Sequence, residues 1–160
     1  MQHYQLFIDG AWSDGADGQV MTSDNPATGA PWASFACASP EDVGRAVEAA
    51  ARALDDPAWR DMTQTARGKL LYRLADLVEA HAQDIGRIET TDSGKLLAET
   101  ASQTGYVADY YRYFAGLADK IEGAVLPIDK PDMHAFTTRV PIGVVAAIVP
   151  WNAQMFLSAT

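Results

Sequence analysis

The first forty residues alternate between short apolar runs and turn residues, a pattern typical of strands joined by tight connections. Asp9-Gly10 lies inside LFIDGAW and predicts a hairpin, because glycine tolerates the positive φ that such a turn requires. Residues 15–18 predict a second turn, and residues 24–29 (DNPATG) predict a third, in which proline fixes φ. With a strand over residues 32–38, the region is predicted to be a small β meander.

Helical periodicity then predicts three amphipathic helices, each of which needs a partner to cover its apolar face. Ser39, followed by proline and Asp42, is a capping-box start for the first helix. The second is expected to end near Gly94 and the third before Gly123. The positions that share a face are Val43, Ala46, Val47, Ala50 and Leu54, then Leu70, Leu71, Leu74, Leu77, Val78 and Ile85, and finally Tyr106, Tyr110, Tyr113, Phe114, Leu117 and Ile121.

The pattern changes again after the third helix. Two extended pieces, around Leu126–Ile128 and Phe136–Val140, flank a polar connection, and the prolines in and after them restrict both pieces to edge positions. We interpret them as an exposed β arm that pairs with the sheet of another subunit. Val144 to Val149 lack polar alternation, which fits a strand covered on both faces in a parallel sheet. The fold class is therefore predicted to be α/β.

Composition narrows the classes of function. The chain has 160 residues, enough for one domain with a core, and a formal net charge of −9. Such a surface argues against nucleic acid and anionic membranes as partners. No apolar run approaches the roughly 20 residues that cross a bilayer, and the N-terminus does not resemble a secretory signal. A single cysteine fits a reducing compartment, so we expect a cytoplasmic protein.

Asn152 is the first candidate for chemistry, because it follows the predicted buried strand. Ligands of open α/β sheets bind outside the carboxyl ends of the strands. A side-chain amide there donates hydrogen bonds without adding charge, which suits the stabilisation of an oxyanion. The alternative is an asparagine that only forms the turn or N-cap before AQMFLSA, and position alone favours this alternative.

Other reactive residue types have simpler interpretations. Cys37 lies in the apolar stretch SFACA without a nearby cation to lower its pKa, so it is interpreted as a small buried hydrophobe. The three histidines have no metal-ligand spacing, and we predict no metal site. The aromatic run YVADYYRYF follows one helical face, which favours core packing over base stacking. No Gly-x-Gly-x-x-Gly motif is present.

A set of motifs, taken together, resembles the NAD(P)-dependent aldehyde dehydrogenase family. PIGVV at 141–145 followed by IVPWN at 148–152 is similar to the family's P-x-G-V … I-x-P-W-N segment. The supporting matches occur in family order and are LFIDGAW at 6–12, NPATG at 25–29, DSGK at 92–95, YYRYFAGLADKIEG at 110–123 and PID at 127–129. The family often has proline two residues after the asparagine, where this chain has Ala153-Gln154. The chain thus resembles an N-terminal fragment of such an enzyme.

The resemblance implies roles for one segment and an order of domains. It implies that the Asn152 amide holds the oxygen of the thiohemiacetal and tetrahedral intermediates, and that Ile148, Val149, Pro150 and Trp151 line the nicotinamide side of the cofactor cleft. Residues 1–123 would be the N-terminal part of an NAD-binding domain and 124–141 an oligomerisation β arm. Residues 142–160 would be the first βα unit of a Rossmann-like domain, cut short.

The implied reaction begins with attack of a cysteine thiolate on a small-molecule aldehyde. Hydride then moves to NAD or NADP, and a glutamate-activated water hydrolyses the resulting thioester to the carboxylate. Neither the nucleophile nor the base has a match in this sequence, so we expect these 160 residues alone to be inactive and the full-length protein to be a homo-oligomer, dimeric or tetrameric. A non-catalytic module that pairs with a full-length relative, and a fragment of a CoA-acylating semialdehyde dehydrogenase, are the alternatives. The identity of the aldehyde stays open.

Overall fold

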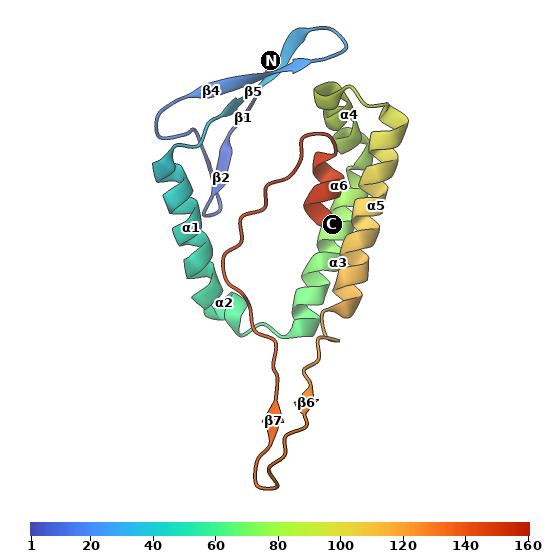
Figure 1. Ribbon diagram of the computed structural model, residues 1–160. Coiled ribbons are helices and arrows are strands. Elements are labelled where there is room, and N and C mark those ends of the chain that lie inside the picture. The colour runs from blue at the N-terminus through green and yellow to red at the C-terminus, as the bar shows by residue number, and fades with distance from the viewer.

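The computed structural model describes residues 1–160 and contains seven short strands and six helices (Figure 1). The strands are β1 (Gln2–Tyr4), β2 (Leu6–Ile8), β3 (Ala11–Ser13), β4 (Val20–Asn25), β5 (Ala30–Ala36), β6 (Val125–Leu126) and β7 (Ala135–Phe136). The helices are α1 (Pro40–Asp55), α2 (Pro57–Arg60), α3 (Gln64–Ala80), α4 (Ala82–Ser93), α5 (Leu97–Leu117) and α6 (Gln154–Ala159). The chain is therefore of the α/β class, as its sequence predicts.

The N-terminal strands do not form a meander, and that prediction is wrong in topology. β5 pairs antiparallel with β4 and parallel with β1, so the sheet order is β1-β5-β4, while β2 and β3 form a separate hairpin. The predicted turns are present: Asp9 and Gly10 connect β2 to β3 with φ values of 54° and 78°. Turn chemistry is local, whereas the pairing of β1 with a strand some thirty residues later depends on tertiary contacts.

Helix α1 begins with the capping box that its sequence predicts. The Ser39 hydroxyl accepts a hydrogen bond from the Asp42 N–H at 3.2 Å, and the Asp42 carboxylate accepts from the Ser39 N–H at 3.0 Å. The same carboxylate accepts from the Ala16 N–H at 2.9 Å, which ties the loop after β3 to the helix. Because the Asp42 side chain is fully buried, these donors replace the water that it has lost.

The helical region is more divided than its periodicity predicts. The predicted second helix is two helices, α3 and α4, which are separated at His81, where ψ is 12°. Periodicity does not detect this bend, since the apolar face continues on both sides of it. Helix α5 ends at Leu117, so Ile121, which was predicted to belong to the third helix, lies outside it. The short helix α2 was not predicted. Gly94 ends α4 in the left-handed conformation, as expected.

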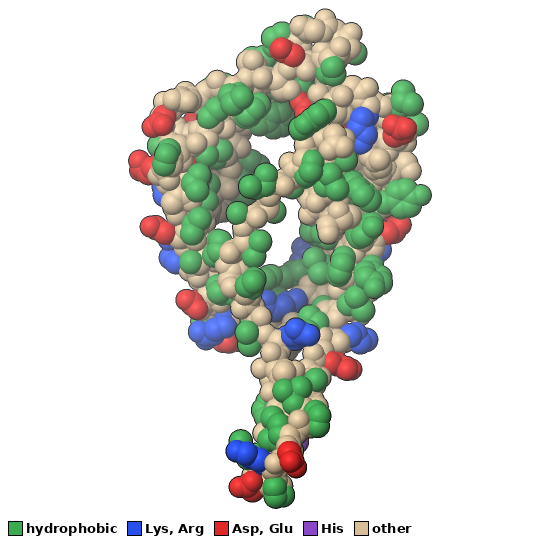
Figure 2. Space-filling view, in the orientation of Figure 1, with side chains coloured by type: hydrophobic (Ala, Val, Ile, Leu, Met, Phe, Trp, Pro, Cys, Tyr) green, Lys and Arg blue, Asp and Glu red, His purple; other side chains and the backbone are tan.

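The core lies between α3 and α5 and is small. Ala75 and Val78 of α3 pack on Val107 and Ala108 of α5, and residues of α6 cover this cluster. Only 16 of the 160 residues are buried, so most large apolar side chains are exposed. Figure 2 shows hydrophobic side chains around the hollowed middle of the molecule, between the α1 side and the α3–α5 side. No helix has the length and apolar character that a membrane span requires.

Residues 118–153 contain the projecting hairpin and an irregular segment (Figure 1). β6 and β7 pair antiparallel and extend away from the rest of the chain, although each strand is shorter than predicted. The buried strand predicted over Val144–Val149 is absent, because no other strand lies beside it to supply hydrogen bonds. Instead, residues 144–146 border a groove of about 360 Å³ together with β2 and α1.

Gly15 offers a test of the contact between the β3–β4 loop and α1. A Cβ at this position would lie 2.0 Å from the Cys37 carbonyl oxygen, so Gly15→Ala must displace the loop that carries Ala16. We expect the free energy of unfolding to fall by about 1–3 kcal/mol, as in overpacked sites. Gly44→Ala is the control, since its Cβ meets nothing within 4 Å and should add about 1 kcal/mol of helix stability. Equal effects of the two variants in urea unfolding would contradict the close contact.

Asp42 makes the stability of α1 dependent on pH. The pKa of its carboxyl lies below the ordinary value of 3.8, mainly because the Ala16 N–H, and then the Ser39 N–H and hydroxyl, donate to the carboxylate. The stabilisation is therefore complete above the ordinary pKa and is lost as the pH falls through the lowered one. We expect Asp42→Asn to reduce this acid-side loss in pH-dependent unfolding, whereas Asp132→Asn, on the exposed arm, should leave it unchanged.

Candidate active site

The residues expected to form the site lie in the irregular segment between β7 and α6. Ile148 is 95% exposed and Trp151 is 77% exposed, so no covered cleft forms around them in this chain. Asn152 is exposed in the turn before α6, and its side chain makes no hydrogen bond. The alternative was an asparagine that forms the turn or the N-cap before this helix: the N-cap of α6 is Ala153, so the cap is wrong, whereas Asn152 does lie in the turn. The amide is thus free to donate to a molecule outside the chain.

Helix α6 holds the end of this segment against the helical region. Met155, Phe156 and Ala159 pack on the core cluster of α3 and α5. The ring of Phe156 meets that of Tyr110 edge to face, with 5.7 Å between the centroids. The turn that carries Asn152 therefore directly precedes a helix with an apolar anchor.

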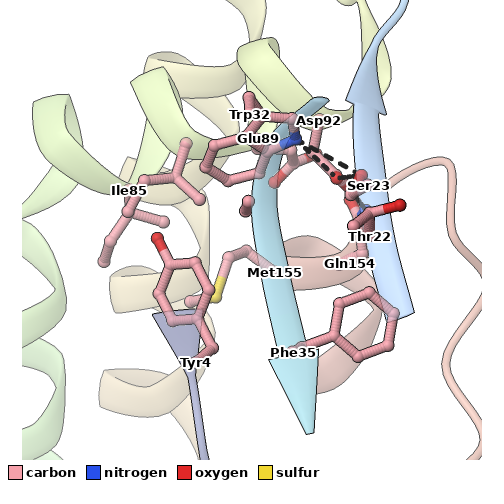
Figure 3. Close-up of a pocket in the computed structure, with 12 residues that line it drawn as sticks. Tyr4, Thr22, Ser23, Trp32, Phe35, Ile85, Glu89, Asp92, Gln154 and Met155 are labelled. Atoms are coloured by element: carbon pink, nitrogen blue, oxygen red, sulfur yellow. Dashed lines mark hydrogen bonds between the residues drawn. The ribbon is translucent and has the colours of Figure 1, made fainter. Parts of the chain in front are cut away.

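A carboxylate at the end of α4 connects four elements of the structure (Figure 3). Asp92 accepts hydrogen bonds from the Ser23 hydroxyl of β4 and, at 3.3 Å, from the Trp32 indole N–H of β5. Its other oxygen accepts from the Gln154 Nε2 of α6 at 3.0 Å. We call Ser23, Trp32, Asp92 and Gln154 the Asp92 cluster. It joins the N-terminal sheet to α4 and α6 by directional contacts.

The end of α4 is itself held by a buried ion pair. After Gly94 turns the chain with a φ of 76°, the Lys95 ammonium returns to Glu89, with 3.0 Å between Nζ and Oε1. The Glu89 side chain is only 4% exposed, and Lys95 also donates to Gln103 of α5. A buried carboxylate needs such a partner, because an unpaired charge is strongly destabilising there. The pair therefore fixes the turn that follows Asp92.

A cavity of about 600 Å³ lies between the N-terminal sheet, α4 and α6 (Figure 3). Its walls are mostly apolar, and Glu89, Asp92 and Gln154 provide the polar groups at its edge. Cys37 is a free thiol outside this cavity. Ser23 also lines the cavity, and its hydroxyl donates to the Asp92 carboxylate. No group of three or more His, Cys, Asp or Glu side chains is placed to hold a metal ion. The cavity has the apolar walls and the few polar groups with which a site can bind or orient a small molecule.

Sequence reasoning missed the role of Asp92 and Gln154. DSGK was recognised only as a motif, and Gln154 only as a departure from the proline that the family often has. The two residues are 62 positions apart, so no local pattern connects them. The usable signal was the change from proline to a side chain with both a donor and an acceptor.

Comparison with known proteins identifies the family. Residues 12–160 match the model of the aldehyde dehydrogenase family, and the chain belongs to that family. It is 57% identical over 159 residues to (Z)-2-((N-methylformamido)methylene)-5-hydroxybutyrolactone dehydrogenase of Acinetobacter baylyi, covering 99% of this chain and 32% of the relative. It is 41% identical to phenylacetaldehyde dehydrogenase of Pseudomonas fluorescens, covering 97% and 32%.

Solved structures agree with this assignment. An NAD-dependent aldehyde dehydrogenase from Sinorhizobium meliloti superposes with a TM-score of 0.93 at 32% identity, covering 99% of this chain and 32% of that one. Betaine aldehyde dehydrogenase from Staphylococcus aureus, in complex with NAD+, gives a TM-score of 0.91 at 32% identity, covering 97% and 31%. The chain therefore spans about a third of the length of the relatives that it matches, and the resemblance stated from its motifs is confirmed.

Proposed function

We propose that the chain is the N-terminal portion of an enzyme that oxidises a small-molecule aldehyde to the carboxylic acid with NAD(P)+. The observation that carries this proposal is the family match over residues 12–160, supported by solved relatives described as NAD-dependent or bound to NAD+. The cysteine nucleophile and glutamate base that the reaction requires would come from sequence outside these 160 residues.

Asn152 is proposed to stabilise the negative charge that develops on the aldehyde oxygen. Its side chain is exposed and bonded to no group of the protein, so both amide hydrogens are available. A neutral donor fits this purpose because its hydrogen bond to the oxygen strengthens as the oxygen gains negative charge. An uncharged amide also forms no ion pair with a catalytic carboxylate.

Ile148, Val149, Pro150 and Trp151 are proposed to contact the nicotinamide end of NAD(P)+, which accepts hydride when bound. The family resemblance suggests the nicotinamide end, and the chemistry is compatible with it, because the four side chains are apolar or aromatic and can pack on a ring. They include no charged group for the pyrophosphate. The exposed fractions of Ile148 and Trp151, 95% and 77%, leave their surfaces free for such a contact.

The β6–β7 hairpin, within residues 124–141, is proposed to be an oligomerisation arm. It extends from the body of the chain, and its apolar residues are open, with Val125 70% and Phe136 64% exposed (Figure 1). Two-stranded ribbons are marginal alone, and their unpaired edges accept a further strand. Both features support pairing with a second copy of the chain.

Replacement of Asn152 by alanine in the complete enzyme tests the catalytic proposal. We expect kcat to fall by about 10²–10³-fold, the loss associated with one oxyanion donor. Asn25→Ala is the control, because Asn25 stabilises only the β4–β5 turn through the Ala27 N–H, at 2.9 Å, and should keep kcat. An unchanged kcat for Asn152→Ala, with the chemical step rate-limiting, would refute the role.

A charge on the arm tests the oligomerisation proposal. Phe136→Asp should shift the complete enzyme toward monomers in analytical ultracentrifugation, since an apolar contact between copies would then bury a carboxylate. Val20→Asp, which changes an exposed apolar residue of β4, should leave the assembly intact. Dissociation by both variants, or by neither, would count against a specific role of the hairpin.

A further inference from the structure

We propose that Gln154, held by Asp92, is a positioning residue that fixes the direction of the Asn152 amide. The inference rests on the proposed function of Asn152 and extends it to the Asp92 cluster. Neither Gln154 nor Asp92 is proposed to contact the substrate. Both act by setting where the turn that carries Asn152 is placed.

The first support is the isolation of the segment around Asn152. The hydrogen bond from Gln154 Nε2 to Asp92 Oδ2, at 3.0 Å, is the only one in the structure between residues 141–160 and the rest of the chain. The other contacts of α6 with the helical region are apolar, through Met155, Phe156 and Ala159. Apolar contacts hold a helix near its partner but are not directional. The edge-to-face pair of Phe156 with Tyr110 orients α6 further along its length, whereas at the end of the helix next to Asn152 the directional contact is that of Gln154.

The second support is proximity along the chain. Gln154 is the first residue of α6, and Asn152 precedes it by two positions. Consecutive Cα atoms lie about 3.8 Å apart, so the two residues cannot separate by more than about 7 Å. Ala153 between them has a φ of −157° and a ψ of 59°, which is neither helical nor extended backbone. Displacement of Gln154 is thus transmitted directly to Asn152.

The third support is the rigidity of the acceptor. Ser23 and the Trp32 indole both donate to Oδ1 of Asp92, which leaves Oδ2 for Gln154. The hydrogen bonds come from two paired strands, so the carboxylate is held from the sheet side as well as by α4. Asp92 has no ion-pair partner, and the Gln154 amide is the side chain that donates to its second oxygen.

The orientation of the Gln154 amide follows from the same contact. A carboxylate only accepts, so the NH₂ group must face Asp92. The amide oxygen is then buried without a partner, which is unfavourable for a polar atom. A proline, which the family often has at this position, would bury no unpaired amide oxygen, but it would also have no side-chain donor for Asp92. This chain instead keeps the directional contact.

Gln154→Glu in the complete enzyme tests the inference, because it keeps the shape and places a carboxylate against Asp92. We expect kcat at neutral pH to fall by roughly tenfold to a hundredfold, as for a small misplacement of a catalytic group. The KM for NAD+ should stay within about twofold, since the packing of α6 is retained. Gln154→Met, which removes the donor without adding charge, should lower kcat in the same direction. Gln83→Glu, the same change at an exposed site of α4, is the control and should leave kcat unchanged.

A reversed pair provides the rescue. In Asp92→Asn/Gln154→Glu, the new asparagine keeps an acceptor for Ser23 and Trp32 and offers its NH₂ group to the new glutamate. We expect kcat to recover most of the loss caused by Gln154→Glu. Absence of recovery in a double variant with the thermal stability of the parent would overturn the inference.

The Asn152→Ala background separates this inference from the proposed function. If Gln154 acts through Asn152, adding Gln154→Glu to Asn152→Ala should lower kcat no further. A full additional loss would show a separate structural role and overturn the positioning proposal alone. An unaffected kcat in Asn152→Ala would instead refute the oxyanion role on which both rest.

Discussion

The Asp92 carboxylate joins separate parts of this chain by hydrogen bonds, which are directional contacts. Strands β4 and β5 donate to one oxygen through Ser23 and Trp32, and α6 donates to the other through Gln154. Apolar packing brings the sheet and the helices together, but it tolerates sliding. The carboxylate limits that sliding because each of its partners must approach along a lone pair. The buried Glu89–Lys95 pair, in turn, holds the turn that follows it.

The other dominant feature is the amount of apolar surface that the chain leaves open. The apolar face of α1, with Val43 and Val47 about half exposed, borders the groove that also contacts residues 144–146. A strand requires a neighbour for its N–H and C=O groups, and residues 144–149 have none within this chain. They consequently stay irregular although their composition is that of a buried strand. The chain spans about a third of its relatives, and its faces suit contact with further polypeptide.

These two features bear differently on the candidate site. The segment from Ile148 to Asn152 is free on its N-terminal side and anchored on its C-terminal side by α6. Its apolar residues are available to pack on a ring, and its single amide is available to an oxygen. In the proposed function, this arrangement contributes a donor and a surface, while the bond-making groups would come from elsewhere. The division explains how a segment without its own nucleophile can still belong to an active site.

Much of the fold was predictable where the controlling interaction is local. The capping box of Ser39 and Asp42, the turn at Asp9-Gly10 and the end of α4 at Gly94 each depend on residues within a few positions. The helical periodicity was also predictable, because side-chain spacing on a helix is set by its geometry. The faces that it assigned to the core are mostly exposed in this chain, however, and Val107 and Ala108 of α5 are buried in place of Tyr106 and Tyr113. Asn152 was a candidate because it follows an apolar run that resembles a buried strand, and the motif around it added an implied role. The sequence did not predict that the Asn152 side chain has no hydrogen-bond partner in the protein.

The rest was decided by contacts between residues that are distant in sequence. The pairing of β1 with β5, the bend at His81 and the bond between Asp92 and Gln154 leave no local pattern, because each depends on where separate elements meet. The irregular course of residues 144–149 is of the same kind, since a strand forms only beside a neighbour. The sequence by itself thus determined the turns, the start of α1, the end of α4 and the family. Only the tertiary structure decided which carboxylate holds the turn of Asn152, because a hydrogen bond requires two groups that the chain brings together only when it folds.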